Sequence, residues 1–125
     1  GVQTCALPIL AISKDLIRGH IDTIILNILN QSDSYGYQVG KSVRILSQNQ
    51  YDLNEATLYT AFRRLEKSGD ITSYWGDETQ GARRKYYKIT PAGQAHLTHA
   101  IVEWAFAKNV ISQLITGTIA EGEES

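Results

Sequence analysis

The chain has 125 residues, 42% of them hydrophobic, and a formal net charge of −1, so it is long enough for one domain with a core and too apolar for a disordered protein. No run of about 18 uncharged apolar residues is present to span a bilayer. The single cysteine, Cys5, can form neither an intrachain disulfide nor a thiolate metal cage. We expect a cytoplasmic protein that needs no cofactor.

The charge is unevenly distributed along the chain. Between Tyr35 and Thr90, nine Lys or Arg residues stand against six Asp or Glu residues, whereas the remainder has three basic against seven acidic residues. The middle of the chain is therefore basic and both ends are acidic. Because basic side chains supply most of the affinity for nucleic acid, this distribution favours a DNA partner despite the overall charge.

The first expected helix follows an apolar leader. Residues 1–12 are interrupted by Pro8 and lack the basic start of a secretory signal, so we expect a disordered or foreign leader there. From Lys14 to about Gln31, apolar residues recur every three or four positions, which predicts an amphipathic helix. These residues are Leu16, Ile17, Ile21, Ile24, Ile25, Ile28 and Leu29.

The next two expected helices form a helix-turn-helix. Residues 32–34 (Ser-Asp-Ser) supply cap candidates for a second short helix that ends near Ser47, and the polar run 47–52 is typical of a turn. Asn54 is the expected N-cap of the third helix, and Gly69 can adopt the left-handed conformation that ends it. The inner stripe of the third helix consists of Leu58, Ala61, Phe62 and Leu65. A short polar connection between two such helices predicts the motif.

A hairpin and a long helix complete the expected fold. Residues 71–75 and 85–89 are rich in β-branched and aromatic residues and predict two paired strands, the wing. Thr90 and Pro91 are suited to cap and begin a helix over 91–116, and residues 117–125 form an acidic disordered tail. We therefore expect a mainly α fold with a small β-hairpin: a winged helix-turn-helix over 13–90 and a C-terminal dimerisation helix over 91–116.

The third helix and the wing indicate binding to duplex DNA. Short polar residues at the start of the helix allow its backbone to approach base edges, and basic residues can contact phosphates. An alternative for Arg63 and Arg64 is that they pair with Glu66 or Asp70 on a solvated surface. The candidate DNA-binding residues are Tyr37, Lys41, Asn54, Glu55, Ala56, Thr57, Tyr59, Thr60, Arg63, Arg64, Gly81, Arg83, Arg84 and Lys85.

The three adjacent cations of the wing strengthen this interpretation. Arg83, Arg84 and Lys85 repel one another unless an anion lies nearby, so packing alone explains them poorly. Alternation along a strand sends Arg83 and Lys85 to one face and Arg84 to the other. We expect at least two of them to contact phosphates.

The fourth helix predicts a two-fold homodimer. It is long and apolar, and so small a fold offers it no full partner. Pairing it with the first and fourth helices of a second copy buries its apolar residues and places two recognition helices on one side, suited to a palindromic operator.

Other function classes find less support. His96 and His99 are three residues apart and could share a metal or a proton, but neither has a Cys or an acid at ligand spacing, and His20 lies on another helix. No phosphate-binding loop or nucleophile motif is present, so we expect neither an enzyme nor a metal site. A winged helix that binds proteins without specific DNA binding remains an alternative.

Several motifs together resemble the PadR family of bacterial transcriptional regulators. They are Tyr35-Gly36-Tyr37, Glu55-Ala56-Thr57-Leu58-Tyr59, Arg64-Leu65-Glu66-Lys67, Gly81 with Arg83-Arg84-Lys85-Tyr86-Tyr87, and Thr90-Pro91-Ala92-Gly93. The resemblance extends from about Lys14 to Ile115. Residues 53–60 and 73–78 are most similar to the multidrug-sensing, LmrR-like subgroup. The resemblance implies a dimeric winged-helix repressor that releases its promoter when an effector binds.

The resemblance also implies an effector site at the dimer centre, where Trp104 matches a ligand-stacking tryptophan. An indole offers stacking area to planar ligands. The implied effector-binding residues are Leu16, Gly19, Thr23, Asn27, Ile101, Trp104, Ala107 and Lys108. The alternative is that Trp104 is only dimer core.

Lys108 departs from the drug-sensing pattern, which has an acid one turn after the tryptophan. Glu103 and Asp22 could restore negative potential, or the effector could be neutral or anionic. A phenolic acid is one such alternative.

Overall fold

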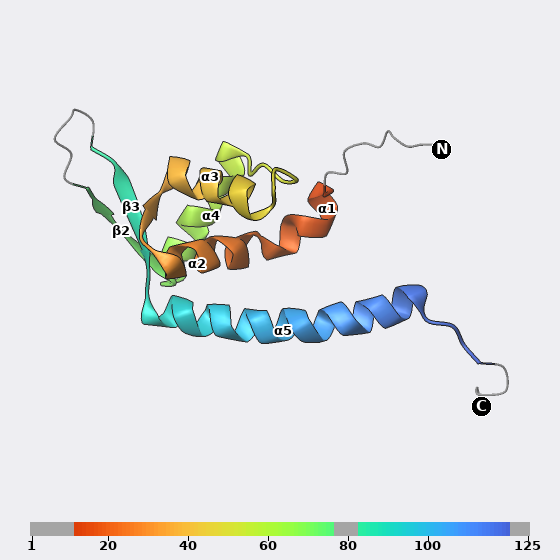
Figure 1. Ribbon diagram of the computed structural model, residues 1–125. Helices are drawn as coiled ribbons and strands as arrows, with labels where there is room; N and C mark the ends of the chain where they lie inside the picture. The colour runs from red at the N-terminus through yellow and green to blue at the C-terminus, as the bar shows by residue number, and fades with distance from the viewer. Residues whose placement is uncertain (1–11, 77–82, 121–125) are drawn as a thin grey trace, which may run out of the picture.

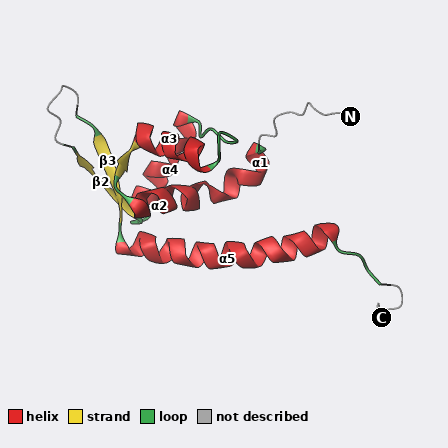
Figure 2. Cartoon of the chain, in the orientation of Figure 1, coloured by secondary structure: helices red, strands yellow, loops and turns green. Residues whose placement is uncertain are grey.

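The computed structural model describes residues 12–76 and 83–120, which form a helical domain, a small sheet at one end of it, and one long helix alongside (Figures 1 and 2). The elements in chain order are α1 (Lys14–Ile17), η1 (Arg18–His20), α2 (Ile21–Gln31), β1 (Ser34–Tyr35), α3 (Gly36–Leu46), α4 (Glu55–Lys67), β2 (Ile71–Trp75), β3 (Lys85–Ile89) and α5 (Pro91–Thr116). The expected winged-helix architecture, mainly α with a small sheet, is confirmed.

The first helix is divided, which the apolar periodicity did not predict. A 3-10 segment, η1, separates α1 from α2; the residue before it, Ile17, has a ψ angle of −13°, and its last residue, His20, has a ψ angle of 0°. Gly19 lies at its centre, where the low helix propensity of glycine weakens the α-helical pattern.

Residues 32–34 do not cap α3, so that expectation was wrong. The N-cap of α3 is Tyr35, and no side chain bonds to the first turn of the helix there. Ser34 and Tyr35 instead form β1, which pairs with Tyr87 and Tyr86 of β3. The sheet therefore has three strands rather than two, in the order β1-β3-β2, with both pairs antiparallel.

The turn between α3 and α4 is tight. Gln48 and Asn49 have φ angles of 54° and 64°, the left-handed region that few non-glycine residues occupy. The Ser47 hydroxyl braces the turn by accepting from the Tyr51 N–H at 3.1 Å. Asn54 then caps α4 as predicted, since its side-chain oxygen accepts from the Thr57 N–H at 3.1 Å.

The core lies between α2, α3, α4 and the inner face of the sheet. Leu58, Ala61, Phe62 and Leu65, the predicted inner stripe of α4, are all buried. The Phe62 ring of α4 stacks on the Tyr87 ring of β3, with centroids 3.8 Å apart, and so joins α4 to the central strand of the sheet. Gly69, with a φ of 86°, ends α4 in the predicted left-handed conformation.

Helix α5 begins where the sequence predicts, and its buried residues lie in its first two turns. The Thr90 hydroxyl accepts from the Gly93 N–H at 3.0 Å, and Pro91 is the first helical residue. Gly93 and Leu97 are buried, but no described residue after Leu97 is. Among the described residues, no helix has both the length and the apolarity to cross a bilayer.

Candidate nucleic-acid interface and ligand cavity

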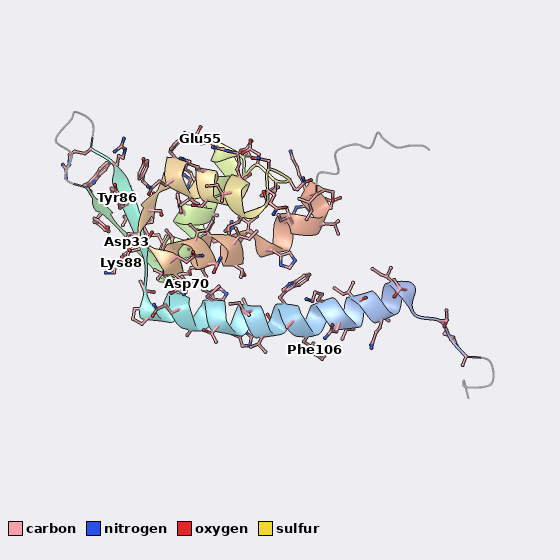
Figure 3. The ribbon with its side chains drawn as sticks, in the orientation of Figure 1. Asp33, Glu55, Asp70, Tyr86, Lys88 and Phe106 are labelled. Atoms are coloured by element: carbon pink, nitrogen blue, oxygen red, sulfur yellow. The ribbon has the colours of Figure 1, made fainter. Side chains whose placement is uncertain are left out.

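The first turn of α4 is open to solvent. Asn54, Glu55, Ala56 and Thr57 are all exposed, while the next residue, Leu58, is 3% exposed and points into the core. Glu55 lies on the side of the domain away from α5 (Figure 3). This end of α4 has the short side chains and the unobstructed approach that a helix needs to enter a major groove.

Tyr59 sets how α4 meets the start of α3. Its ring packs edge-on against Phe62 at 5.6 Å, and a Cβ atom added to Gly36 would lie 2.1 Å from its hydroxyl oxygen. A side chain at position 36 would therefore require the Tyr59 ring to move. Tyr37 and Lys41, on the outer side of α3, are both exposed beside this junction.

The two arginines of α4 have different environments. Arg63 donates to Thr60 of the same helix at 3.3 Å and stays exposed. Arg64 instead makes a two-pronged ion pair with Asp22 of α2, with its Nε 3.1 Å from Oδ2. This bond raises the Arg64 pKa further and commits its charge to the domain. Arg63 is thus better placed than Arg64 to meet DNA.

Glu66 and Asp70, the alternative partners of Arg63 and Arg64, bond to other residues. Glu66 accepts from the Ser73 hydroxyl at 2.6 Å, and Asp70 lies 2.8 Å from Nδ1 of His96. These contacts join α4 to β2, and the α4–β2 junction to α5. The pairing of Arg63 or Arg64 with Glu66 or Asp70 therefore does not occur.

Aromatic rings accommodate the three cations of the wing. The Arg83 guanidinium lies 5.5 Å from the ring centre of Trp75, that of Arg84 lies 4.7 Å from Tyr35, and the Lys85 ammonium lies 5.7 Å from Tyr87. Such cation–π contacts are favourable by about 0.5–1 kcal/mol at exposed sites. They orient the side chains without covering them, since all three cations remain exposed. Gly81, the remaining wing candidate, lies outside the described residues.

A cavity of about 670 Å³ lies beside Trp104. Five of the eight expected effector residues line it: Leu16, Thr23, Asn27, Ile101 and Trp104. The other three, Gly19, Ala107 and Lys108, do not. The remaining lining residues are Ile12, Ile17, His20, Ile24, Val43, Leu46, Ser47, Tyr51, Leu97 and Ala100.

Four of the ten unexpected lining residues have a common origin. Val43, Leu46, Ser47 and Tyr51 come from α3 and its turn, which had been assigned to the helix-turn-helix alone. Leu46 follows the buried Val43 by three residues, yet it is 59% exposed and borders the cavity. The cavity therefore touches the DNA-binding motif.

His20 and Trp104 form the side of the cavity nearest α5. Their rings meet edge-on with centroids 4.8 Å apart, which fixes the indole while leaving the Trp104 side chain 45% exposed. Tyr51 lies in the opposite wall, and burial followed by the nearby Asp52 carboxylate raises its pKa, so its phenol is neutral at physiological pH.

Two of the three histidines have different partners. His96 contacts Asp70, and His20 contacts Trp104. Within residues 12–76 and 83–120, no three His, Cys, Asp or Glu side chains gather closely enough to hold a metal ion.

Comparison with known proteins places the chain in a family. Residues 25–99 match the "Transcriptional regulator PadR-like family". A transcriptional regulator from Clostridium thermocellum has a TM-score of 0.78 and 48% identity, covering 85% of this chain and all of its own. A PadR family transcription regulator from Clostridium difficile has a TM-score of 0.68 and 38% identity over 78% of this chain and 99% of its own. A protein of Lysinibacillus sphaericus is 42% identical over 106 residues, which are 85% of this chain and 97% of that protein. The chain belongs to the PadR-like family and is a DNA-binding transcriptional regulator.

Proposed function

We propose that this regulator is a homodimeric repressor that leaves its operator when a planar aromatic effector binds beside Trp104. The observation that carries the proposal is the cavity, which brings Trp104 of α5 and the end of α3 into one lining. An occupant of this cavity contacts the helix-turn-helix directly. Ligand binding and DNA binding can therefore influence each other within one chain.

The exposed surface of α5 supports a dimer. Val102, Phe106, Leu114 and Ile115 are each at least 65% exposed, and Phe106 points away from the domain (Figure 3). A helix this apolar on several sides is stable in water when another surface covers it. A second copy of the chain can cover this surface with its own α5, and a palindromic operator also calls for two copies of the protein.

The DNA-binding surface consists of the start of α4, the outer side of α3 and the wing. Thr57 is exposed at the first turn of α4, where it can read base edges, and Arg83 is exposed beside the wing, where it can contact a phosphate. Arg64 contributes by holding α4 against α2 through Asp22 rather than by touching DNA.

A titration of the protein with its own upstream DNA tests this function. We expect tight binding to a palindromic site that weakens with salt and is relieved by a planar ligand that quenches tryptophan fluorescence. Trp104→Ala should abolish the response to the ligand and keep DNA binding, whereas Trp75→Ala should keep the response. Binding that ignores both sequence and ligand would contradict the proposal.

Two substitutions separate phosphate contact from base reading. Arg83→Ala should weaken binding to all duplexes and lower the salt slope by about one ion, while Thr57→Val should mainly change sequence preference. Lys108→Ala is the control, because Lys108 lies on α5, away from this surface. Equal, small effects of Arg83→Ala and Thr57→Val on every duplex would show that α4 and the wing do not face DNA.

A further inference from the structure

We propose that Asp33 and Tyr74 position the wing for DNA, acting through a row of tyrosine rings that ends at Arg84. The inference rests on the DNA-binding surface of the proposed function and adds two positioning residues to it. Three features carry it: the row of rings across the sheet, the bond that fastens one end of the row, and the arginine held at the other end.

Three tyrosines form a row across one face of the sheet. Tyr35 of β1 is paired with Tyr86 of β3, and Tyr86 is paired with Tyr74 of β2. Residues paired in this way project their side chains from the same face. The Tyr74 ring stacks on that of Tyr86, with centroids 5.6 Å apart, and the Tyr35 ring meets Tyr86 edge-on at 5.4 Å. The row therefore spans all three strands.

A hydrogen bond fastens the β2 end of this row to the residue before β1. The Tyr74 hydroxyl donates to Oδ2 of Asp33 at 2.6 Å, although the two residues are 41 positions apart. Because β1 and β2 are the edges of the sheet, the bond reaches across the central strand, β3. The same bond raises the pKa of Tyr74, so its phenol keeps its proton and stays a donor at physiological pH.

The β1 end of the row holds Arg84. Its guanidinium lies 4.7 Å from the centre of the Tyr35 ring. The backbone is held as well, because the Gly76 N–H donates to the Arg84 carbonyl oxygen at 2.7 Å. Gly76 itself packs on the Tyr86 ring, where an added Cβ atom would lie 2.5 Å from a ring carbon. The side chain and the backbone of Arg84 thus both depend on where the row lies.

Arg84 lies on the side of the domain that carries the proposed DNA-binding surface. Strand β3 ends beside the start of α5, so Arg84, just before the first residue of β3, lies at the far end of the strand from α5 (Figure 1). Glu55, in the first turn of α4, also lies away from α5 (Figure 3). An arginine loses conformational freedom when it binds a phosphate, and a ring that already orients it reduces this loss. We therefore expect the row to raise DNA affinity through Arg84.

The affinity of the full chain for its own upstream DNA tests the role of Tyr74. Tyr74→Phe removes only the hydroxyl and should weaken binding about three- to tenfold. Arg84→Ala should weaken it at least as much, and Tyr74→Phe added to Arg84→Ala should cause little further loss. Thr72→Val is the control, since it removes a hydroxyl from the same strand and the same face and should leave the affinity unchanged.

A charge-matched pair of variants tests the role of Asp33. Asp33→Ala and Asp33→Asn both remove a negative charge, which by itself favours binding to DNA. Asparagine, however, retains an oxygen that can accept from the Tyr74 hydroxyl. Asp33→Ala should therefore bind DNA severalfold more weakly than Asp33→Asn, and this difference should vanish when Tyr74→Phe is added to both.

The outcomes separate this inference from the proposed function. Unchanged affinity in Tyr74→Phe, or in Arg84→Ala, would overturn the inference. A loss in Tyr74→Phe that persists in the Arg84→Ala background, with a parallel fall in the unfolding midpoint, would also overturn it, because the hydroxyl would then stabilise the fold alone. Binding of the unaltered protein without any sequence preference would contradict the proposed function, while the losses described above would still decide the role of Asp33 and Tyr74.

Discussion

The ion pair between Asp22 and Arg64 should couple the stability of α2 to that of the recognition helix. The two residues are 42 positions apart in the chain, and the contact is two-pronged, with the Arg64 Nε 3.1 Å from one carboxylate oxygen. Their side chains are 32% and 53% exposed, so solvent screens the pair only in part. Exposed pairs contribute about 0.2–1 kcal/mol, and this geometry favours the upper end, about 1 kcal/mol.

A double-mutant cycle with Asp22→Asn and Arg64→Gln measures this coupling. Urea unfolding of the four proteins should give a coupling free energy of about 1 kcal/mol, equivalent to about 4 °C in Tm, and it should fall in high salt. Arg63→Gln is the matched control, since Arg63 donates to Thr60 within its own helix and makes no ion pair with Asp22 among the described residues. A coupling free energy indistinguishable from zero would refute the reasoning and reduce the pair to a solvated contact.

Three further predictions concern the fold. Gly93→Ala should destabilise the protein by at least about 1–3 kcal/mol in urea unfolding, because the new Cβ would lie 2.1 Å from the Asp70 carbonyl oxygen. Gly40→Ala is the control: Gly40 has open space around it, so alanine there should stabilise α3 by about 0.5–1 kcal/mol. Equal changes in the free energy of unfolding for the two variants would contradict this explanation. Thr90→Ala should cost about 1 kcal/mol and fray the first turn of α5, seen as faster hydrogen exchange there. Burial raises the pKa of Tyr87, so its contribution to stability is complete below the ordinary tyrosine pKa of about 10 and is lost as pH rises through the folded value. Tyr87→Phe should therefore flatten the fall of the unfolding midpoint as the pH rises above about 10, and an unchanged pH profile would exclude Tyr87 as its source.

Local features of the fold could be predicted because local residues cause them. The cap at Asn54, the Thr90–Pro91 start of α5 and the left-handed Gly69 each depend on a few neighbouring residues. The buried stripe of α4 follows from its spacing alone. The break at η1 escaped prediction, since apolar periodicity continues through it while the backbone changes pitch.

The candidate site was only partly predictable. Resemblance to a family, together with the charge pattern, led to the exposed start of α4 and to Trp104. It did not lead to the wall of the cavity formed by Leu46 and Tyr51, because periodicity assigns those residues to the helix-turn-helix and carries no information about what lies across from it.

The sequence by itself determined the order of the longer helices and of β2 and β3, the caps of α4 and α5, and the buried side of α4, since these depend on spacing and on a few neighbouring residues. Only the tertiary structure decided the long-range pairings. Ser34 joins Tyr87 in the sheet instead of capping α3, Arg64 pairs with Asp22, and Trp104 shares a cavity with Tyr51. The physical reason is that such contacts depend on how whole elements are placed against one another, and that placement is set by the packing of the entire core.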